Sequence, residues 1–300
     1  MASELRRYNI DIAALSETRL PDEGSLTERD QGYTFFWKGL PSGSPRIHGV
    51  GFAIRNSLLH LLPETPVGIN ERLMSLRIPL SKGRYLTILS VYAPTLVSDE
   101  TIKDCFYDVL YKTLQAVPRH DKLMIIGDFN ARVGSDYTTW GGVIGKHGVG
   151  NVNSNGLRLL TLCSEFDLVI TNTLFQQRDQ LKTTWMHPRS KHWHLLDYVL
   201  VRRSDSTDVT LTRAMRGAEC WTDHRLLRST IVLHIRPPAR KKRPVPRLNT
   251  KSCKRAEIQL ALQTRLAEEF PEEITDPPAA VVDTASLSAE WEKISSCLMK

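Results

Sequence analysis

The sequence has no long apolar run. Its longest uncharged apolar stretches, such as residues 58–62 and 123–126, span only a few residues. A bilayer crossing needs roughly 20 such residues. The first residues carry Glu4, Arg6 and Arg7, where a secretory signal would have an apolar segment. We therefore expect neither a membrane span nor a secretory signal.

Paired cysteines are also lacking. The five cysteines are scattered, their number is odd, and no Cys-x-x-Cys pair occurs. This pattern argues against a disulfide scaffold and a structural zinc site, and it suits a reducing compartment. The sequence contains no His-Glu-x-x-His pattern and no nucleotide-binding glycine loop. Zinc hydrolase, ATP and NAD chemistry are therefore unsupported.

Acidic residues are absent from one short segment, which holds most of the net charge of +7. Residues 236–256 contain nine Lys and Arg and no Asp or Glu, and they are rich in proline. Such a composition is typical of an extended linker. We expect a domain over residues 1–235, a basic linker over 236–256 and a helical tail over 257–300.

Before the linker, short β-branched apolar runs alternate with segments of helical period, which predicts a mixed α/β domain. We expect strands over residues 10–15, 51–54, 73–78, 85–92, 122–127, 168–171, 195–201 and 226–233. We expect helices over residues 101–116 and 155–166, and over 252–270 and 286–299 after the domain.

Polar side chains repeatedly stand where an expected strand begins or ends. The set is Glu17, Tyr92, Asp128, Asn130, Asp197, Asp223 and His224. One carboxylate at a strand end is usually a turn or helix cap. Four of them, with a phenol, an amide and an imidazole, indicate a catalytic cleft.

The residue types in this set match the needs of phosphodiester hydrolysis. The anionic substrate repels hydroxide, and its leaving oxygen gains charge as the bond breaks. Mg²⁺ takes hard oxygen ligands and helps with both problems. A second carboxylate can activate water, and an imidazole can stabilise the phosphoryl oxygens.

Five motifs carry a family resemblance. They are Leu15-Ser-Glu-Thr-Arg19, Ser90-Val-Tyr-Ala-Pro94, Gly127-Asp-Phe-Asn130, Leu196-Asp-Tyr-Val-Leu200 and Thr222-Asp-His224. In this order they resemble the endonuclease/exonuclease/phosphatase superfamily, and within it the apurinic-type endonuclease domain of non-LTR (LINE-type, RTE-like) retrotransposons. The resemblance implies an α/β four-layer sandwich, with two mixed β-sheets flanked by helices and a site at one edge.

The resemblance also implies a role for each residue of the set. Glu17 would be a ligand of Mg²⁺, with Mn²⁺ as an alternative ion, and Asp223 would help hold the ion or its waters. Tyr92 would contact the scissile phosphate. From its position alone, Tyr92 could equally be a buried strand aromatic.

Three further roles concern water and the phosphoryl oxygens. Asp128 would position or deprotonate the attacking water, with Asn130 beside it. His224 would contact the phosphoryl oxygens, oriented by Asp197. A carboxylate–imidazole pair fixes the tautomer and the orientation of the ring. As an isolated residue, Asp197 could equally be a cap or a salt-bridge partner.

Relatives of this type begin with a strand that bears an active-site Asn and continue with a helix. Met1 lies sixteen residues before Glu17, which leaves room for the end of that helix and one strand. We therefore expect the first strand of the fold to be lacking, with Asn9 in no position to replace it. Its absence would leave backbone groups of neighbouring strands without partners.

DNA is the expected partner. The candidate contacts are Arg132, Lys182, Arg189, Lys191 and Trp193, mostly from a basic and aromatic hairpin-like stretch before Leu195. Basic and aromatic side chains suit phosphate and base contact, although a solvated loop would look the same. The run over residues 240–244 fits a nuclear import signal, a DNA tether or a solvated linker.

The leading functional hypothesis is a magnesium-dependent endonuclease that nicks DNA and leaves a 3′-hydroxyl, located in the nucleus and possibly also in the cytoplasm. A second hypothesis is a catalytically silent nucleic-acid- or chromatin-binding derivative. A third is a phosphatase on the same fold.

Overall fold

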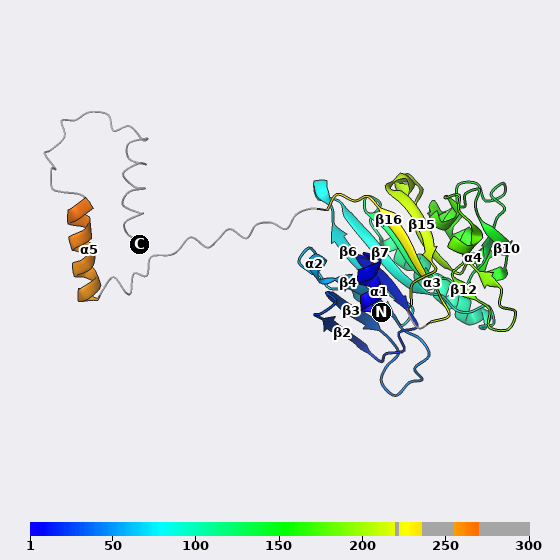
Figure 1. The fold of residues 1–300 in the computed structure, drawn as a ribbon, viewed down its shortest axis with the longest axis horizontal. Coiled ribbons are helices and arrows are strands. Elements are labelled where there is room, and N and C mark those ends of the chain that lie inside the picture. The colour runs from blue at the N-terminus through cyan, green and yellow to red at the C-terminus, as the bar shows by residue number, and fades with distance from the viewer. Residues whose placement is uncertain (220–221, 236–254, 270–300) are drawn as a thin grey trace, which may run out of the picture. The chain divides into compact units, whose positions relative to one another are not determined.

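The computed structural model describes residues 1–219, 222–235 and 255–269 (Figure 1). The chain divides into two compact units, Met1–Pro238 and Ala239–Lys300. In the second unit the described element is helix α5 (Ala256–Glu269), within the helix expected over 252–270. Residues 236–254 of the linker expected over 236–256, and the helix expected over 286–299, lie outside the described residues, so the division into three segments stays a prediction.

The first unit contains an antiparallel sheet of four strands in the order β1-β4-β3-β2. The strands are β1 (Ile12–Ser16), β2 (Glu23–Glu28), β3 (Tyr33–Lys38) and β4 (Val50–Arg55). Helix α1 (Ala2–Arg7) precedes β1, and helix α2 (Asn56–Leu59) follows β4.

A second sheet of six strands has the order β11-β14-β8-β7-β6-β5. Its strands are β5 (Val67–Asn70), β6 (Leu73–Pro79), β7 (Tyr85–Tyr92), β8 (Lys122–Asp128), β11 (Leu168–Ile170) and β14 (Asp197–Arg202). Strands β7 and β8 are parallel, and helix α3 (Glu100–Ala116) forms the crossover between them, as parallel neighbours require. Helix α4 (Ser154–Glu165) precedes β11.

Three small ladders complete the unit. They are β9 (Val133–Gly134) with β10 (Val149–Val152), β12 (Trp185–Met186) with β13 (Trp193–His194), and β15 (Val209–Met215) with β16 (Leu226–Ile231).

The two large sheets pack face to face. Phe52 of β4, Ile88 of β7 and Met124 of β8 belong to one buried cluster between them. Because side chains alternate across a strand, the next residue along β7, Leu89, faces the other way and packs with helices α3 and α4. On the far side, Ala53 of β4 packs with α1. The result is four layers, helix, sheet, sheet and helices, as the resemblance implied.

The β15–β16 hairpin lies in the layer of the four-stranded sheet. Leu227 and Ile231 pack on the core between the sheets, whereas Leu226 packs on the cluster that contains α1. Among the described residues, β1 pairs only with β4 and β16 only with β15. Both strands therefore present one unpaired edge, and no strand precedes α1 in the printed sequence.

Each strand and helix expected in residues 1–235 is present to within about two residues at its ends. Strands β2, β3, β5 and β15 were not expected from the sequence. Strand β2 is polar and solvent-exposed, with Leu26 at 62% exposure, so it lacks the buried alternation on which strand prediction depends. No helix in the described residues has the length and apolarity needed to cross a membrane.

Candidate active site

Three of the polar residues lie side by side in the six-stranded sheet. Strand pairing sets Tyr92 of β7 next to Asp128 of β8, and Asp128 opposite Asp197 of β14. Asp128 is buried, with 4% of its surface exposed. The ladder register thus places a phenol and two carboxylates in one row at the end of the sheet.

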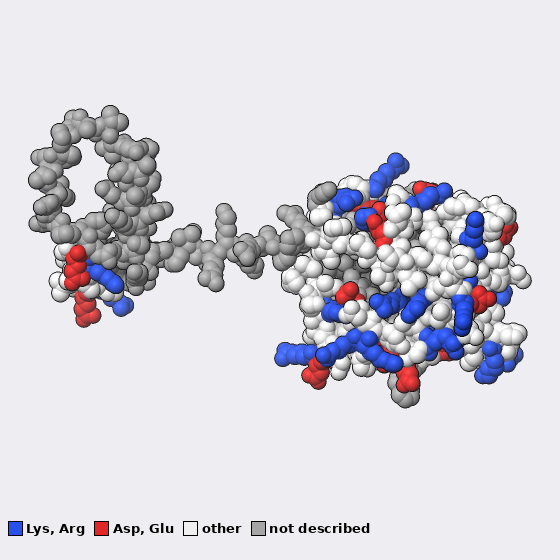
Figure 2. All heavy atoms as spheres, turned by 45° about the horizontal axis from the view of Figure 1, so that its top comes forward, with Lys and Arg blue, Asp and Glu red and all other residues white. Residues whose placement is uncertain are grey.

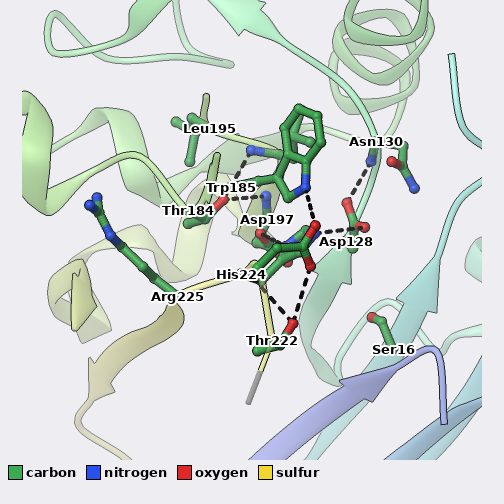
Figure 3. A network of polar contacts seen from close by, with 12 residues as sticks. Ser16, Asp128, Asn130, Thr184, Trp185, Leu195, Asp197, Thr222, His224 and Arg225 are labelled. Carbon is green, nitrogen blue, oxygen red and sulfur yellow. Dashed lines mark hydrogen bonds and ion pairs between the residues drawn. The ribbon is translucent and has the colours of Figure 1, made fainter. Parts of the chain in front are cut away.

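The Gly-Asp-Phe-Asn motif has a local reason for its glycine. Gly127 adopts φ +150°, and a Cβ at this position would lie 1.9 Å from the backbone oxygen of Val91. Two residues later, the backbone N–H of Asn130 donates to Oδ1 of Asp128 at 2.8 Å, while Asn130 Nδ2 donates to the Ala93 oxygen at 3.0 Å. Asn130 therefore holds one oxygen of Asp128 through its backbone (Figure 3).

His224 joins this row from the segment before β16. Its Nδ1 lies 2.9 Å from Asp197 Oδ2, and its Nε2 lies 4.0 Å from Asp128 Oδ2 (Figure 3). The Asp197 backbone is held in turn, because Thr184 Oγ1 accepts from its N–H at 3.2 Å and Asn172 Nδ2 donates to its oxygen at 3.0 Å. One imidazole nitrogen is thus fixed by a carboxylate, and the other faces the buried Asp128.

The charges in this row strongly perturb one another. Burial, together with the neighbouring carboxylate of Asp197, raises the pKa of Asp128 to about 8. For His224, burial works against the charged form, but the charge of Asp197 and its hydrogen bond outweigh burial and raise the pKa to about 9. Without a cation, these interactions favour a charged imidazole on His224 and the protonated form of Asp128.

Glu17 reaches the same place from the end of β1. It accepts a hydrogen bond from Tyr92 Oη at 2.7 Å and pairs with Arg19 at 2.7 Å. Burial acts to raise the pKa of Glu17, but the bonds from Tyr92 and Arg19 outweigh it and lower the pKa. Burial and the bond to Glu17 raise the pKa of Tyr92. Glu17 is therefore a carboxylate at neutral pH, and Tyr92 is a neutral donor.

Asp223, the neighbour of His224, is exposed. Its Oδ2 accepts a hydrogen bond from Trp185 Nε1 at 2.7 Å. An isolated β-bridge also joins Trp185 to His224. The β12–β13 hairpin therefore positions the segment that carries both site residues.

Sequence reasoning assigned no catalytic role to Arg72 or to His48. Arg72 is buried, donates to the Tyr92 oxygen at 3.2 Å and lies 5.3 Å from the centroid of the Tyr92 ring. His48 lies 3.0 Å from the Arg72 guanidinium. No pattern in the sequence marked Arg72, because its burial beside strand β6 shows only in the structure.

Glu17, Asp128, Asp197, Asp223 and His224 all line one cavity of about 1570 Å³. Ligand atoms of Asp128, Asp197 and His224 lie within 4.8 Å of one another. Carboxylate oxygens with an imidazole are a donor set that can hold a divalent metal ion. Glu17 and Asp223 bring further carboxylate oxygens to the same cavity.

The candidate DNA contacts lie in two places, the β12–β13 hairpin and the cavity. Arg189 and Lys191 are exposed on the loop between β12 and β13, and Arg132 lines the cavity. Trp193 of β13 has its ring covered by the Arg225 guanidinium at 3.2 Å. Figure 2 shows Lys and Arg spread over one face of the first unit among neutral atoms.

Lys182 does not lie at the surface, so the expectation that it contacts DNA is wrong. It is buried, with 7% exposure, and its Nζ donates to Asp179 at 3.2 Å. A buried amine with a carboxylate partner serves packing and charge balance. In the sequence it looked like part of a solvent-facing basic cluster because burial cannot be read from charge alone.

A sequence profile described as the Endonuclease/Exonuclease/phosphatase family matches residues 1–224. The chain belongs to this family. Craniofacial development protein 2 of Bos taurus is 32% identical over 286 residues, which cover 94% of this chain and 45% of that protein. The chain therefore spans less than half the length of this curated relative.

Solved structures of other members of the family share the fold. The AP endonuclease LMAP from Leishmania major has a TM-score of 0.55 at 15% identity, covering 79% of this chain and 83% of its own. The endonuclease domain of TRAS1, a telomere-specific non-LTR retrotransposon, has a TM-score of 0.51 at 17% identity, covering 77% and 90%. These likenesses show a fold shared with nucleases, including one from a retrotransposon.

Proposed function

We propose that this chain is a divalent-metal-dependent endonuclease that hydrolyses a phosphodiester bond in DNA and leaves a 3′-hydroxyl. The observation that carries the proposal is the convergence of Asp128, Asp197 and His224. Glu17 and Asp223 line the same cavity. When bound, Mg²⁺ or Mn²⁺ would supply positive charge to the phosphoryl oxygens and favour the ionised form of nearby carboxylates. Glu17 and Asp223 would hold the ion.

The remaining residues have distinct proposed tasks. Asp128, with one oxygen held by the Asn130 backbone, would accept the proton of the attacking water. His224 would donate to a phosphoryl oxygen through Nε2, since Nδ1 is bonded to Asp197. Tyr92 would orient Glu17 and meet the phosphate from the same side. Arg132, Arg189, Lys191 and Trp193 would contact the DNA.

Metal removal tests the proposal directly. With Mg²⁺ we expect the 300-residue chain to convert supercoiled plasmid to open circles. EDTA should abolish nicking, and added Mg²⁺ or Mn²⁺ should restore it. DNA ligase should seal the nicks, which would show a 3′-hydroxyl facing a 5′-phosphate. If the chain bound the plasmid but did not nick it, the result would support a silent binding protein. If it released inorganic phosphate from a phosphomonoester but did not nick the plasmid, the result would support a phosphatase.

Trp185→Phe probes the hydrogen bond to Asp223. The substitution keeps an aromatic ring but removes the Nε1–H donor. We expect the Mg²⁺ concentration for half-maximal nicking to rise ~10-fold, as when other partners of metal ligands are lost, with little change at saturating Mg²⁺. Trp193→Phe, in the same hairpin but under Arg225, is the matched control. An unchanged Mg²⁺ dependence in Trp185→Phe would argue against the role of Asp223.

The hairpin loop can be tested by salt dependence. Replacing Arg189 and Lys191 together by alanine should weaken duplex binding and lower the slope of log K against log salt by ~2, about one for each lost phosphate contact. Fluorescence anisotropy in EDTA at several salt concentrations gives the slope. Alanine at Arg29 and Lys112, exposed cations elsewhere, should leave it unchanged. Equal slopes for both double variants would remove the loop from the interface.

A further inference from the structure

Glu17 lies in a strained turn after β1. Its backbone φ is +52°, a left-handed conformation that is uncommon for residues other than glycine and is most often adopted by Asn, Asp and His among them. Such strain persists only where the surrounding structure holds the backbone in place. The turn that carries Glu17 therefore needs contacts from elsewhere in the fold.

The loop between β3 and β4 supplies the first of these contacts. The Arg19 N–H donates to the His48 oxygen at 3.0 Å, and the Thr18 N–H donates to the Gly49 oxygen at 3.1 Å. Gly49 has φ +126°, and a Cβ there would lie 2.2 Å from Thr18 Oγ1. Glycine at this position thus permits the close approach of the two segments. His48 and Gly49 therefore hold the two residues that follow Glu17.

The ring of His48 meets Arg72, which lies in the turn between β5 and β6. The Arg72 guanidinium is 3.0 Å from His48 Nε2. Burial and the charge of Arg72 lower the pKa of His48, which favours a neutral ring that can accept this hydrogen bond. Arg72 is buried, and its ion pair with Glu71 is loose at 4.0 Å. Since a buried charge is costly without a close partner, this ion pair does not explain the arginine.

Arg72 holds Tyr92 at three points. Its backbone oxygen accepts from the Tyr92 N–H at 2.9 Å, and its Nη1 donates to the Tyr92 oxygen at 3.2 Å. Its guanidinium carbon lies 5.3 Å from the centroid of the Tyr92 ring, within cation–π range. Tyr92 Oη donates in turn to Glu17 at 2.7 Å. These contacts form a closed ring that passes through Glu17, the turn after it, His48, Arg72 and Tyr92.

We propose that Arg72 and His48 are positioning residues, which fix Glu17 and Tyr92 in the arrangement that receives the divalent ion and the phosphate. Arg72 acts through Tyr92, and His48 acts through Arg72 and through the turn after Glu17. The consequence for the ion rests on the proposed function, because Glu17 holds an ion only in that proposal. The positioning of the turn does not depend on it.

Manganese binding without DNA measures the effect on the ion site. Binding of Mn²⁺ to the 300-residue chain is followed by the electron paramagnetic resonance signal of the free ion. Arg72→Met keeps an unbranched side chain but removes its charge and donors, and it should weaken binding ~10-fold, as when other partners of metal ligands are lost. His48→Phe should weaken binding in the same direction. In a Glu17→Gln background, Arg72→Met should cause no further loss, because Arg72 acts through Glu17.

Arg77→Met is the matched control, because Arg77 lies on β6 and is remote from this ring of contacts. Its Nε donates to the buried Asp121 at 2.9 Å. The substitution should lower Tm by leaving Asp121 without this partner, but it should not change the affinity for Mn²⁺. An equal loss of affinity in Arg77→Met would mean that general destabilisation explains the result for Arg72→Met, and it would overturn the proposal.

Hydrogen exchange in EDTA separates this inference from the proposed hydrolysis. Arg72 does not contact the amides of Thr18 and Arg19, yet Arg72→Met should speed their exchange roughly threefold or more, the effect of one lost hydrogen bond on a local opening. Arg77→Met should leave these amides unchanged. Unchanged exchange at both amides in Arg72→Met would overturn the proposal. Faster exchange in a chain that binds no Mn²⁺ would support the positioning role and count against the proposed hydrolysis.

Discussion

His224→Ala is expected to slow DNA nicking ~1000-fold or more, because it removes the group that we propose faces the phosphoryl oxygens and that a fixed carboxylate orients. The geometry on which this depends is the 2.9 Å contact with Asp197 on one ring nitrogen and the 4.0 Å approach of the other to Asp128. The measurement is the initial rate of plasmid relaxation at saturating Mg²⁺. His192→Ala, exposed in the hairpin loop, is the control and should retain the wild-type rate.

A double-mutant cycle separates the role of Asp197 from general damage. Asp197→Asn alone should slow nicking less than His224→Ala, since the ring remains but loses its charged partner. Because Asp197 acts through His224, the double variant His224→Ala with Asp197→Asn should be no slower than His224→Ala alone. Additive losses would mean that Asp197 contacts substrate or metal independently.

Asp128→Asn is expected to abolish nicking and yet to stabilise the protein. Amide replacement removes the proposed base but keeps its shape and its hydrogen bond from Asn130. The folded-state pKa of Asp128 is about 8, above the unfolded value of about 4. Between these pH values the unfolded chain loses this proton and the folded chain keeps it, so the carboxyl group destabilises the fold increasingly as pH rises.

The gain in stability should therefore be largest at pH 8, about 3 °C or more in Tm for a domain of this size, and should shrink toward pH 4. Thermal unfolding in EDTA at pH 5, 6.5 and 8 measures it. Asp197→Asn is the contrasting variant, because it breaks the pair that holds His224 charged, and it should lower Tm at pH 7. A lower Tm for Asp128→Asn at pH 8 would contradict the electrostatic account of the row.

The buried strands and helices of the fold could be predicted from the sequence, because buried positions leave a pattern of apolar residues. Strand β7 was expected over 85–92 and forms over Tyr85–Tyr92, and its seven consecutive buried residues agree with a mostly apolar run that lacks exposed polar alternation. Strand β2 has no such trace. Its pairing with β3 comes from the backbone and from neighbours distant in sequence, which local composition does not record.

Interpretation of the site was limited in a related way. The motifs identified the polar residues near strand ends. Contacts between segments far apart in the sequence determine which groups each of these residues touches. The bond between Trp185 and Asp223, the arginine over Tyr92 and the burial of Lys182 all depend on segments far apart in sequence. None of these contacts changes a local pattern, so none could be anticipated.

The alignment of Tyr92, Asp128 and Asp197 in one row has a consequence for how the proposed activity could be lost. Their alignment depends on the pairing of β7, β8 and β14, and sliding β14 by a single position would turn the Asp197 side chain to the opposite face of the sheet. A misassembled molecule could therefore keep its helices, its compactness and much of its heat resistance while losing all turnover. Specific activity would then report the fraction of molecules in which β14 is correctly paired. Circular dichroism would not distinguish them from misassembled molecules.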